Sequence, residues 1–191
     1  MKLNAKELRN IDADDAQSSI VNRKTHPIYL ILENVYDTYN IGGLFRLADA
    51  IGVQKLYLCG QLEIPPNPKI KKASIGTYKI VPWEYKKSAI EAIADLKSKY
   101  QITNNKSNSN NKIQIVAVEQ SPKSVPYTQG NYSIPVALIV GNETFGVLPE
   151  TLDLVGQIVE IPMFGINKSL NVIVSAAIVS YWVMDQLRNK L

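Results

Sequence analysis

The fold of this chain is constrained most by a series of short apolar runs in which hydrophobic residues do not alternate with polar ones. The runs lie within PIYLILEN (27–34), QKLYLCG (54–60), TYKIVPW (77–83), KIQIVAVE (112–119), PVALIVGN (135–142) and GQIVEIPM (156–163). A strand that is apolar on both sides must be covered on both faces of its sheet, as in parallel sheets. Because helical patterns separate several runs, the sequence predicts an α/β fold with a mainly parallel sheet flanked by helices.

Helical patterns occur in four places after residue 26. They are NIGGLFRLADAIG (40–52), read as a turn followed by a helix, KIKKASIG (69–76), read as a short helix or a turn, the amphipathic YKKSAIEAIADLKSKY (85–100), and a long helix from about Ser169 to Leu187. In the third, Ile90, Ile93, Ala94 and Leu96 are the candidates for the inward face.

Length and composition favour one domain. A chain of 191 residues with 46% hydrophobic content can bury one substantial core. We expect residues 1–26 to form an N-terminal helical extension and residues 27–191 to form the domain. The segment TNNKSNSNNK (103–112) is rich in Asn, Ser and Lys, so we expect a flexible loop there.

Several classes of protein are disfavoured by what the sequence contains. Cys59 and His26 are the only cysteine and the only histidine, so we expect no disulfide, no metal site and structural roles for both. No run reaches the ~20 apolar residues of a membrane span, and the N-terminus lacks the apolar stretch of a signal peptide. We therefore expect a cytoplasmic protein without a membrane partner.

The positive charge is concentrated in one segment. The whole chain has a net charge of +4, but residues 65–112 contain ten lysines and three acidic residues, a local net charge of +7. Tyr78, Trp83, Tyr85 and Tyr100 lie among these lysines. This pattern is typical of a surface that binds phosphates and unstacked bases. A solvated, lysine-rich helix face with buried aromatic residues explains it equally well.

A glycine pair, Gly42 and Gly43, follows the first predicted strand. The dinucleotide fingerprint G-x-G-x-x-G and the P-loop pattern are both absent. Asn40 is a predicted N-cap, and Arg46 follows at least one turn later, so a phosphate or nucleotide could bind at this helix end. The alternative is an ordinary capped helix whose small residues allow close packing.

Two polar loops follow later strands, within LIVGNETFGVLPE (138–150) and EIPMFGINKSLNVIVSAA (160–177). Together with the turn at Asn40, they could converge at the carboxyl edge of the sheet, where parallel sheets hold ligands. The last helix is apolar nearly all round from Val172 to Met184. It therefore packs either on its own sheet and a partner subunit, or fully inside its own core.

Three motifs, in this order, resemble those of the SpoU/TrmH group of SPOUT RNA ribose 2′-O-methyltransferases. They are N-x-G-x-x-x-R (Asn40 to Arg46), G-N-E-x-x-G (Gly141 to Gly146) and I-P-M-x-G-x-x-x-S-L-N-V (Ile161 to Val172). The segment KKASIGTYKIVPWEY (71–85) is also similar to the stretch after the second strand in that family. The resemblance covers roughly residues 27–187.

This resemblance implies a SPOUT fold with a C-terminal trefoil knot, the cofactor S-adenosylmethionine, and a homodimer whose active sites are completed across the interface. It implies cofactor contacts at Gly141, Ile161, Met163 and Leu170. It also implies a catalytic set consisting of Asn40, Arg46, Glu143, Ser169 and Asn171. Arg46 would either assist deprotonation of the 2′-hydroxyl or act as an electrostatic clamp. A guanidinium pKa above ~12 favours the clamp.

Three functions are therefore considered. The first is methyl transfer to a ribose 2′-hydroxyl, with tRNA favoured over rRNA because the N-terminal extension is short. The second is RNA binding without catalysis on the same fold. The third is a nucleotide-dependent enzyme of the doubly wound type, which the absent glycine fingerprint disfavours.

Overall fold

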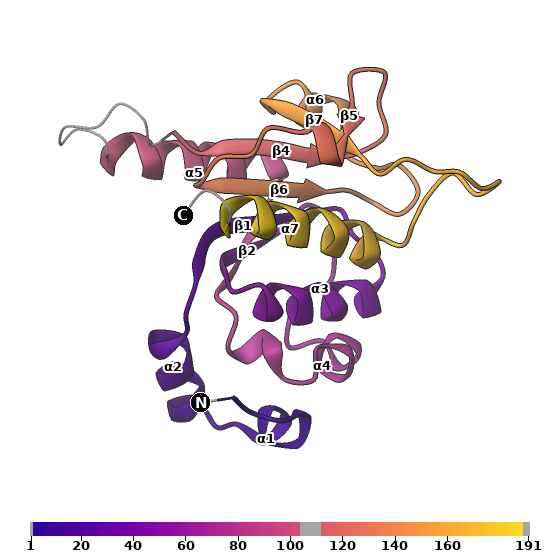
Figure 1. Cartoon of the computed structure of the whole chain (residues 1–191). Helices are drawn as coiled ribbons and strands as arrows, with labels where there is room; N and C mark the ends of the chain where they lie inside the picture. Colours follow the sequence, from indigo (N-terminus) through magenta and orange to yellow (C-terminus); the bar gives the residue numbers. More distant parts are fainter. Residues whose placement is uncertain (1, 104–111, 189–191) are drawn as a thin grey trace.

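The computed structural model describes residues 2–103 and 112–188. All but the two end residues of the predicted flexible loop 103–112 lie outside the described residues. One seven-stranded sheet has the order β3-β2-β1-β6-β4-β7-β5 (Figure 1). Its strands are His26–Glu33 (β1), Val53–Cys59 (β2), Trp83–Lys86 (β3), Gln114–Val118 (β4), Val125–Pro126 (β5), Val136–Val140 (β6) and Gln157–Glu160 (β7). All neighbouring strands are parallel, which confirms the predicted α/β class.

Helices cover both faces of this sheet (Figure 1). They are Ala5–Asn10 (α1), Ala13–Asn22 (α2), Thr38–Ala50 (α3), Pro68–Ser74 (α4), Ala89–Thr103 (α5), Pro149–Leu152 (α6) and Val172–Arg188 (α7), with 3₁₀ turns at Thr77–Lys79 (η1) and Tyr127–Gln129 (η2). Helices α3 and α7 pack on one face, whereas α5 packs on the other. None of the described helices combines the length and apolar character needed to cross a bilayer.

The central strand β1 explains why apolar residues are continuous in the sequence. Leu30 and Leu32 belong to the core on the side of α3 and α7. Tyr29 and Ile31 belong to the core on the side of α5. Because both faces are buried, each position from Ile28 to Leu32 gains from an apolar side chain, by about 1.5–3 kcal/mol for a fully buried Leu or Ile.

Helix α5 begins later than the sequence predicted, at Ala89 instead of Tyr85. Its buried positions are Ala89, Ala92, Ile93 and Leu96, the i, i+3, i+4, i+7 spacing of one helical face. The prediction was right for Ile93 and Leu96. It was wrong for Ile90 and Ala94, which are exposed. The buried face is completed by Ala89 and Ala92 instead.

The predicted strand 77–83 was wrong. The backbone at Ile75 and Gly76 is left-handed, and the following residues form the 3₁₀ turn η1, so strand β3 begins only at Trp83. The hydrophobic residues there serve loop packing instead, since Val81 joins the main core and Ile80 packs against the N-terminal helices. Strand β5 is only two residues long and was not predicted.

The N-terminal residues form the two short helices α1 and α2, which dock near η1. Ile11 and Ala16 pack with Ile80. The ammonium of Lys79 donates to the carbonyl oxygen of Ile11 over 2.8 Å. The extension therefore contacts the α4–η1 side of the molecule.

The glycine pair of α3 provides close packing on two sides. A Cβ on Gly42 would collide with the Cβ of Ala73 and come within 2.9 Å of the backbone nitrogen of Ser74, so α4 contacts α3 here. A Cβ on Gly43 would meet only the side chain of Ile173 on α7. The packing interpretation of these glycines is therefore confirmed.

The two glycines should respond differently to alanine. Each substitution gains about 1 kcal/mol of helix propensity. Gly42→Ala must displace α4 backbone, and we expect a net loss of about 1–2 kcal/mol in the free energy of unfolding. Gly43→Ala displaces only the flexible end of Ile173 and should lose less or nothing. Urea unfolding of the matched pair tests this, and a larger loss in Gly43→Ala would contradict it.

Candidate active site

Three loops that are far apart in the sequence meet at the carboxyl edge of the sheet through the side chain of Asn40. Its Nδ2 donates to Oε1 of Glu143 over 2.8 Å, and its Oδ1 accepts from Nδ2 of Asn171 over 3.0 Å. Asn40 is buried. Both ends of its amide are therefore used, and this fixes the amide's orientation. The predicted convergence of the three loops is confirmed for these three residues.

Glu143 also holds the segment that precedes α3. Its carboxylate accepts from the backbone nitrogens of Tyr36 and Asp37, over 3.2 and 3.3 Å. The N-cap of α3 is Asp37, whose side chain accepts from the nitrogen of Tyr39 over 2.8 Å. The predicted N-cap role of Asn40 was wrong, because the helix is capped three residues earlier. The Glu143 carboxylate thus fixes the backbone just before α3.

Asn171 joins this cluster to the last helix. Its Oδ1 accepts from the nitrogen of Ile173 over 2.9 Å, at the start of α7. The helix begins at Val172 and not near Ser169, because residues 161–171 form an irregular loop. Asn171 therefore fixes the end of this loop relative to α3.

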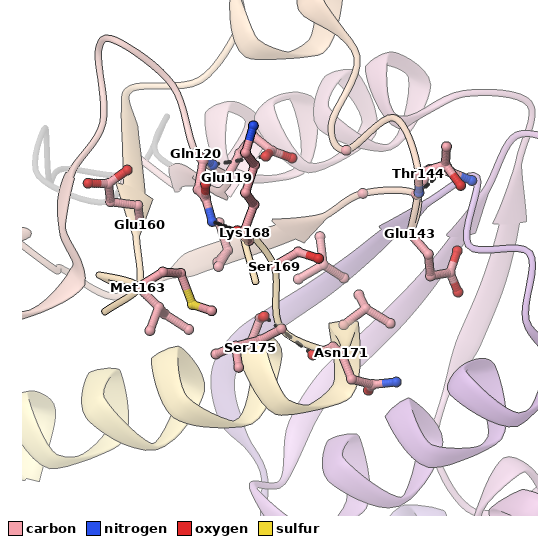
Figure 2. A pocket seen from close by; sticks show the side chains of 18 of the residues that line it. Glu119, Gln120, Glu143, Thr144, Glu160, Met163, Lys168, Ser169, Asn171 and Ser175 are labelled. Atoms are coloured by element: carbon pink, nitrogen blue, oxygen red, sulfur yellow. Dashed lines mark hydrogen bonds between the residues drawn. The ribbon is translucent and has the colours of Figure 1, made fainter. Parts of the chain in front are cut away.

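A cavity of about 620 Å³ opens beside this cluster, between the ends of β4, β6 and β7 and the start of α7 (Figure 2). All four residues predicted to contact the cofactor line it, together with three of the predicted catalytic residues. These are Gly141, Ile161, Met163 and Leu170, and Glu143, Ser169 and Asn171. A volume of this size falls in the range of small-molecule and cofactor sites.

The loop after β6 is shaped by close backbone contact and by Asn142. A Cβ on Gly141 would collide with the backbone of Gly146 and Val147. Oδ1 of Asn142 accepts from the nitrogens of Thr144 and Phe145, over 2.8 and 2.9 Å. These contacts set the shape of the cavity wall.

Two residues at the end of β4 line the cavity and were not predicted (Figure 2). Oε2 of Glu119 accepts from the nitrogen of Val147 over 2.8 Å. Nε2 of Gln120 donates to the carbonyl oxygen of Lys168. Glu119 and Gln120 thus support the loops after β6 and β7. A signal existed, since both are polar residues directly after a buried strand.

Arg46 lies outside this hydrogen-bonded cluster. It follows Asn40 by six positions on α3, about 9 Å along the helix axis. Its side chain is exposed and makes no hydrogen bond or ion pair with any described residue. Ser169 lines the cavity, and its nitrogen donates to Oδ1 of Asn167. The catalytic roles of these residues stay predictions.

The aromatic residues of the lysine-rich segment 65–112 differ in their exposure and contacts. Trp83 packs edge-on against Phe45, with ring centroids 6.3 Å apart, and Tyr100 packs similarly against Tyr29, so these aromatic rings are structural. Tyr85, in contrast, is exposed.

The sequence pattern of the SpoU rRNA methylase family matches residues 27–181. The chain belongs to this family. The tRNA (guanosine(18)-2′-O)-methyltransferase of Aquifex aeolicus is 29% identical over 177 residues, which are 90% of this chain and 75% of that protein. The resemblance read from three motifs is therefore confirmed for the SpoU family.

Solved structures of SpoU-type proteins share the fold. The A. aeolicus TrmH/SpoU tRNA modifying enzyme has a TM-score of 0.73 at 26% identity and covers 97% of this chain and 83% of its own. An AdoMet-bound rRNA methyltransferase from Sinorhizobium meliloti has a TM-score of 0.69 at 25% identity. The match covers 94% of this chain and 60% of that protein's chain. These likenesses confirm the SPOUT type of fold, while the threading of the knot stays a prediction.

The two hydrogen bonds of the Asn40 side chain, with Glu143 and with Asn171, are called the Asn40 relay below. They predict that substitutions at Asn40 and Glu143 have coupled effects on the stability of this SpoU chain. Asn40→Asp faces Glu143 with a second carboxylate, and we expect it to lower the free energy of unfolding by about 1–3 kcal/mol at neutral pH. Adding Glu143→Gln places an amide donor opposite the new carboxylate at position 40. The double variant should therefore recover part of the lost stability. Urea unfolding of the four-protein cycle measures the coupling. Additive losses would contradict the relay.

The environment of Glu33, the last residue of β1, predicts that the free energy of unfolding depends on pH. Burial raises the pKa of its carboxyl, although Thr151 Oγ1 and the nitrogen of Leu148 donate to it. A carboxyl with a higher pKa in the folded than in the unfolded chain stabilises most below the unfolded value of about 4.3, and this stabilisation is lost as pH rises through the folded pKa.

Glu33→Gln mimics the protonated carboxyl. Its free energy of unfolding should match the wild type near pH 4 and exceed it increasingly toward pH 7. Urea unfolding across this range measures the difference, with the exposed Glu63→Gln as the matched control that shows little change. A wild type that becomes the more stable protein as pH rises would be the opposite result.

Proposed function

We propose that this chain is an S-adenosylmethionine-dependent RNA methyltransferase that methylates a ribose 2′-hydroxyl, with tRNA as its substrate in the cytoplasm. One observation carries the proposal. The cofactor-sized cavity and the Asn40–Glu143–Asn171 cluster adjoin one another at the carboxyl edge of the sheet, and Glu143 and Asn171 belong to both. The family match supports RNA methylation, and the similarity to the tRNA-modifying enzyme of A. aeolicus, in sequence and in fold, supports tRNA as the substrate.

The residues around the cavity fit the cofactor chemically. Among the described residues that line it, Glu119, Glu143 and Glu160 stand against the one cation Lys168, so these ionisable side chains favour a positively charged ligand. When bound, S-adenosylmethionine supplies the methyl group from its sulfonium. The backbone of Gly141, Ile161, Met163 and Leu170 would hold it.

The polar cluster positions the acceptor ribose. Asn40 orients the Glu143 carboxylate, and Asn171 keeps this pair at the mouth of the cavity. Holding the hydroxyl oxygen in line with the methyl group lowers the barrier by on the order of 7–11 kcal/mol in well-arranged cases. As the new carbon–oxygen bond forms, the 2′-hydroxyl proton passes to solvent water. Arg46 acts as a cation near the nucleotide, where it would bind the phosphate and stabilise the negative charge that develops on the 2′-oxygen, because a guanidinium is a donor and not a base.

The proposal is tested with labelled S-adenosylmethionine and RNA. The wild type should transfer methyl to the tRNA fraction more than to rRNA, and nuclease digestion should yield 2′-O-methylnucleosides. Arg46→Ala should reduce transfer by about 100-fold or more, while the calorimetric affinity for the cofactor stays within about twofold. Arg9→Ala removes the same charge from α1 and should retain activity. Near wild-type transfer by Arg46→Ala would rule out this role.

The protein acts as a homodimer in this proposal, and helix α7 supplies the interface. Val174 and Tyr181 lie seven positions apart on it and are 44% and 54% exposed. The alternative that α7 is inserted fully into its own core is therefore wrong for the single chain. Sedimentation should give twice the chain mass, and Tyr181→Asp should shift it toward the monomer. A wild-type monomer at micromolar concentration would contradict the interface.

A further inference from the structure

A second cavity, of about 410 Å³, lies at the same edge of the sheet as the first. The first is built on the ends of β4, β6 and β7, and the second on the ends of β1, β2 and β3. The loop 141–148 contributes to both, through residues 141–146 to the first and Leu148 to the second. The two cavities are therefore neighbours along the sheet, with this loop between them.

Hydrogen bonds connect the linings of the two cavities. Tyr36 lines the second, and its backbone nitrogen donates to Glu143, which lines the first. Asn34 lines the second, and its carbonyl oxygen accepts from Nδ2 of Asn142 over 2.7 Å. The second cavity therefore adjoins the Glu143 cluster through direct hydrogen bonds.

The lining of the second cavity offers aromatic rings. Tyr36 and Tyr85 are 52% and 44% exposed. The hydroxyl of Tyr85 donates to the carbonyl oxygen of Gly60 over 3.3 Å, which restrains the ring at the cavity wall. Exposed tyrosines provide faces on which bases of single-stranded RNA stack.

The same lining offers donors for a phosphate and for a base edge. The ammonium of Lys87 has no hydrogen-bond or ion-pair partner within the described part of the chain. Oδ1 of Asn34 accepts from the nitrogen of Gln61 over 2.8 Å, and this orients the amide so that its Nδ2 is free of partners among the same residues. Amide donors pair with the carbonyl oxygens and ring nitrogens of bases.

The negative groups near this cavity are already engaged. Glu33 accepts from the nitrogen of Leu148 and from the hydroxyl of Thr151. Glu91 accepts from the backbone nitrogen of Lys87 over 3.0 Å. Lys87 is the one cation that residues 2–103 and 112–188 contribute to this lining, and the nearby carboxyls of Glu33 and Glu91 have partners of their own.

We propose that this second cavity binds an unstacked nucleobase of the substrate RNA, with Tyr36 and Tyr85 as stacking surfaces, Asn34 at the base edge and Lys87 at the adjoining phosphate. The proposal rests on the proposed function, because it takes the RNA strand to pass the Glu143 cluster. It assigns to β1–β3 the binding of the base and to β4–β7 the binding of the cofactor.

The test compares two fluorescein-labelled decamers by anisotropy with the full chain, one a single-stranded RNA of mixed sequence and the other its abasic analogue. Wild type should bind the RNA more tightly. Tyr36→Ala and Tyr85→Ala should weaken RNA binding by roughly tenfold and leave the abasic decamer unchanged. Tyr85→Phe keeps the ring and should retain most of the affinity.

Lys87→Gln should weaken both decamers and reduce the salt dependence of binding, because it removes a phosphate contact. Lys123→Gln is the matched control. Lys123 lies next to β5, the outermost strand on the side of the sheet away from β3, and its substitution should change the affinity for neither decamer. Calorimetry with S-adenosylmethionine should show unaltered cofactor affinity in every variant, which also verifies folding.

Equal wild-type affinity for the two decamers, or equal losses on both from the tyrosine variants, would overturn the proposal. Failure of the proposed function gives a different result. Wild type would then bind no S-adenosylmethionine and transfer no methyl group, whatever its preference between the decamers.

Discussion

The active-site edge depends on one buried amide. Asn40 donates to Glu143 and accepts from Asn171, so a single side chain of α3 fixes two loops that lie 103 and 131 residues further along the chain. A buried amide with only one of these partners would lose about 1–3 kcal/mol to the unsatisfied group. This cost makes the arrangement of the loops cooperative, because each loop satisfies a group that belongs to another.

The parallel sheet makes such a meeting possible. When all strands run in one direction, every loop that follows a strand emerges at the same edge. Glu33, Asn34, Glu119, Gln120 and Asn142 are all polar residues at or just beyond strand ends, and all of them support a wall or a loop by hydrogen bonds. The shape of the edge therefore rests on side-chain to backbone contacts, which position loops that have no regular structure.

The sequence predicted the sheet, its direction and the convergence of the loops, since continuous apolar runs and polar residues after them have direct physical causes. It failed where the cause is tertiary. Residues 77–83 are hydrophobic because Ile80 and Val81 pack in a turn, and no local pattern separates this from a strand. The N-cap at Asp37 was missed because Asn40 is an equally good capping residue, and only its long-range contact with Glu143 reveals its other role.

The loop 141–148 lines both cavities and is held in place by close backbone contact and by hydrogen bonds. Its path allows no Cβ at Gly141, because the backbone of Gly146 and Val147 occupies that space. Asn142, Val147 and Leu148 then connect it to the ends of β1 and β4. A wall held from both sides cannot shift toward one cavity without breaking bonds on the other. The hydrogen bonds on the two sides of this loop therefore set the shape of both cavity walls together.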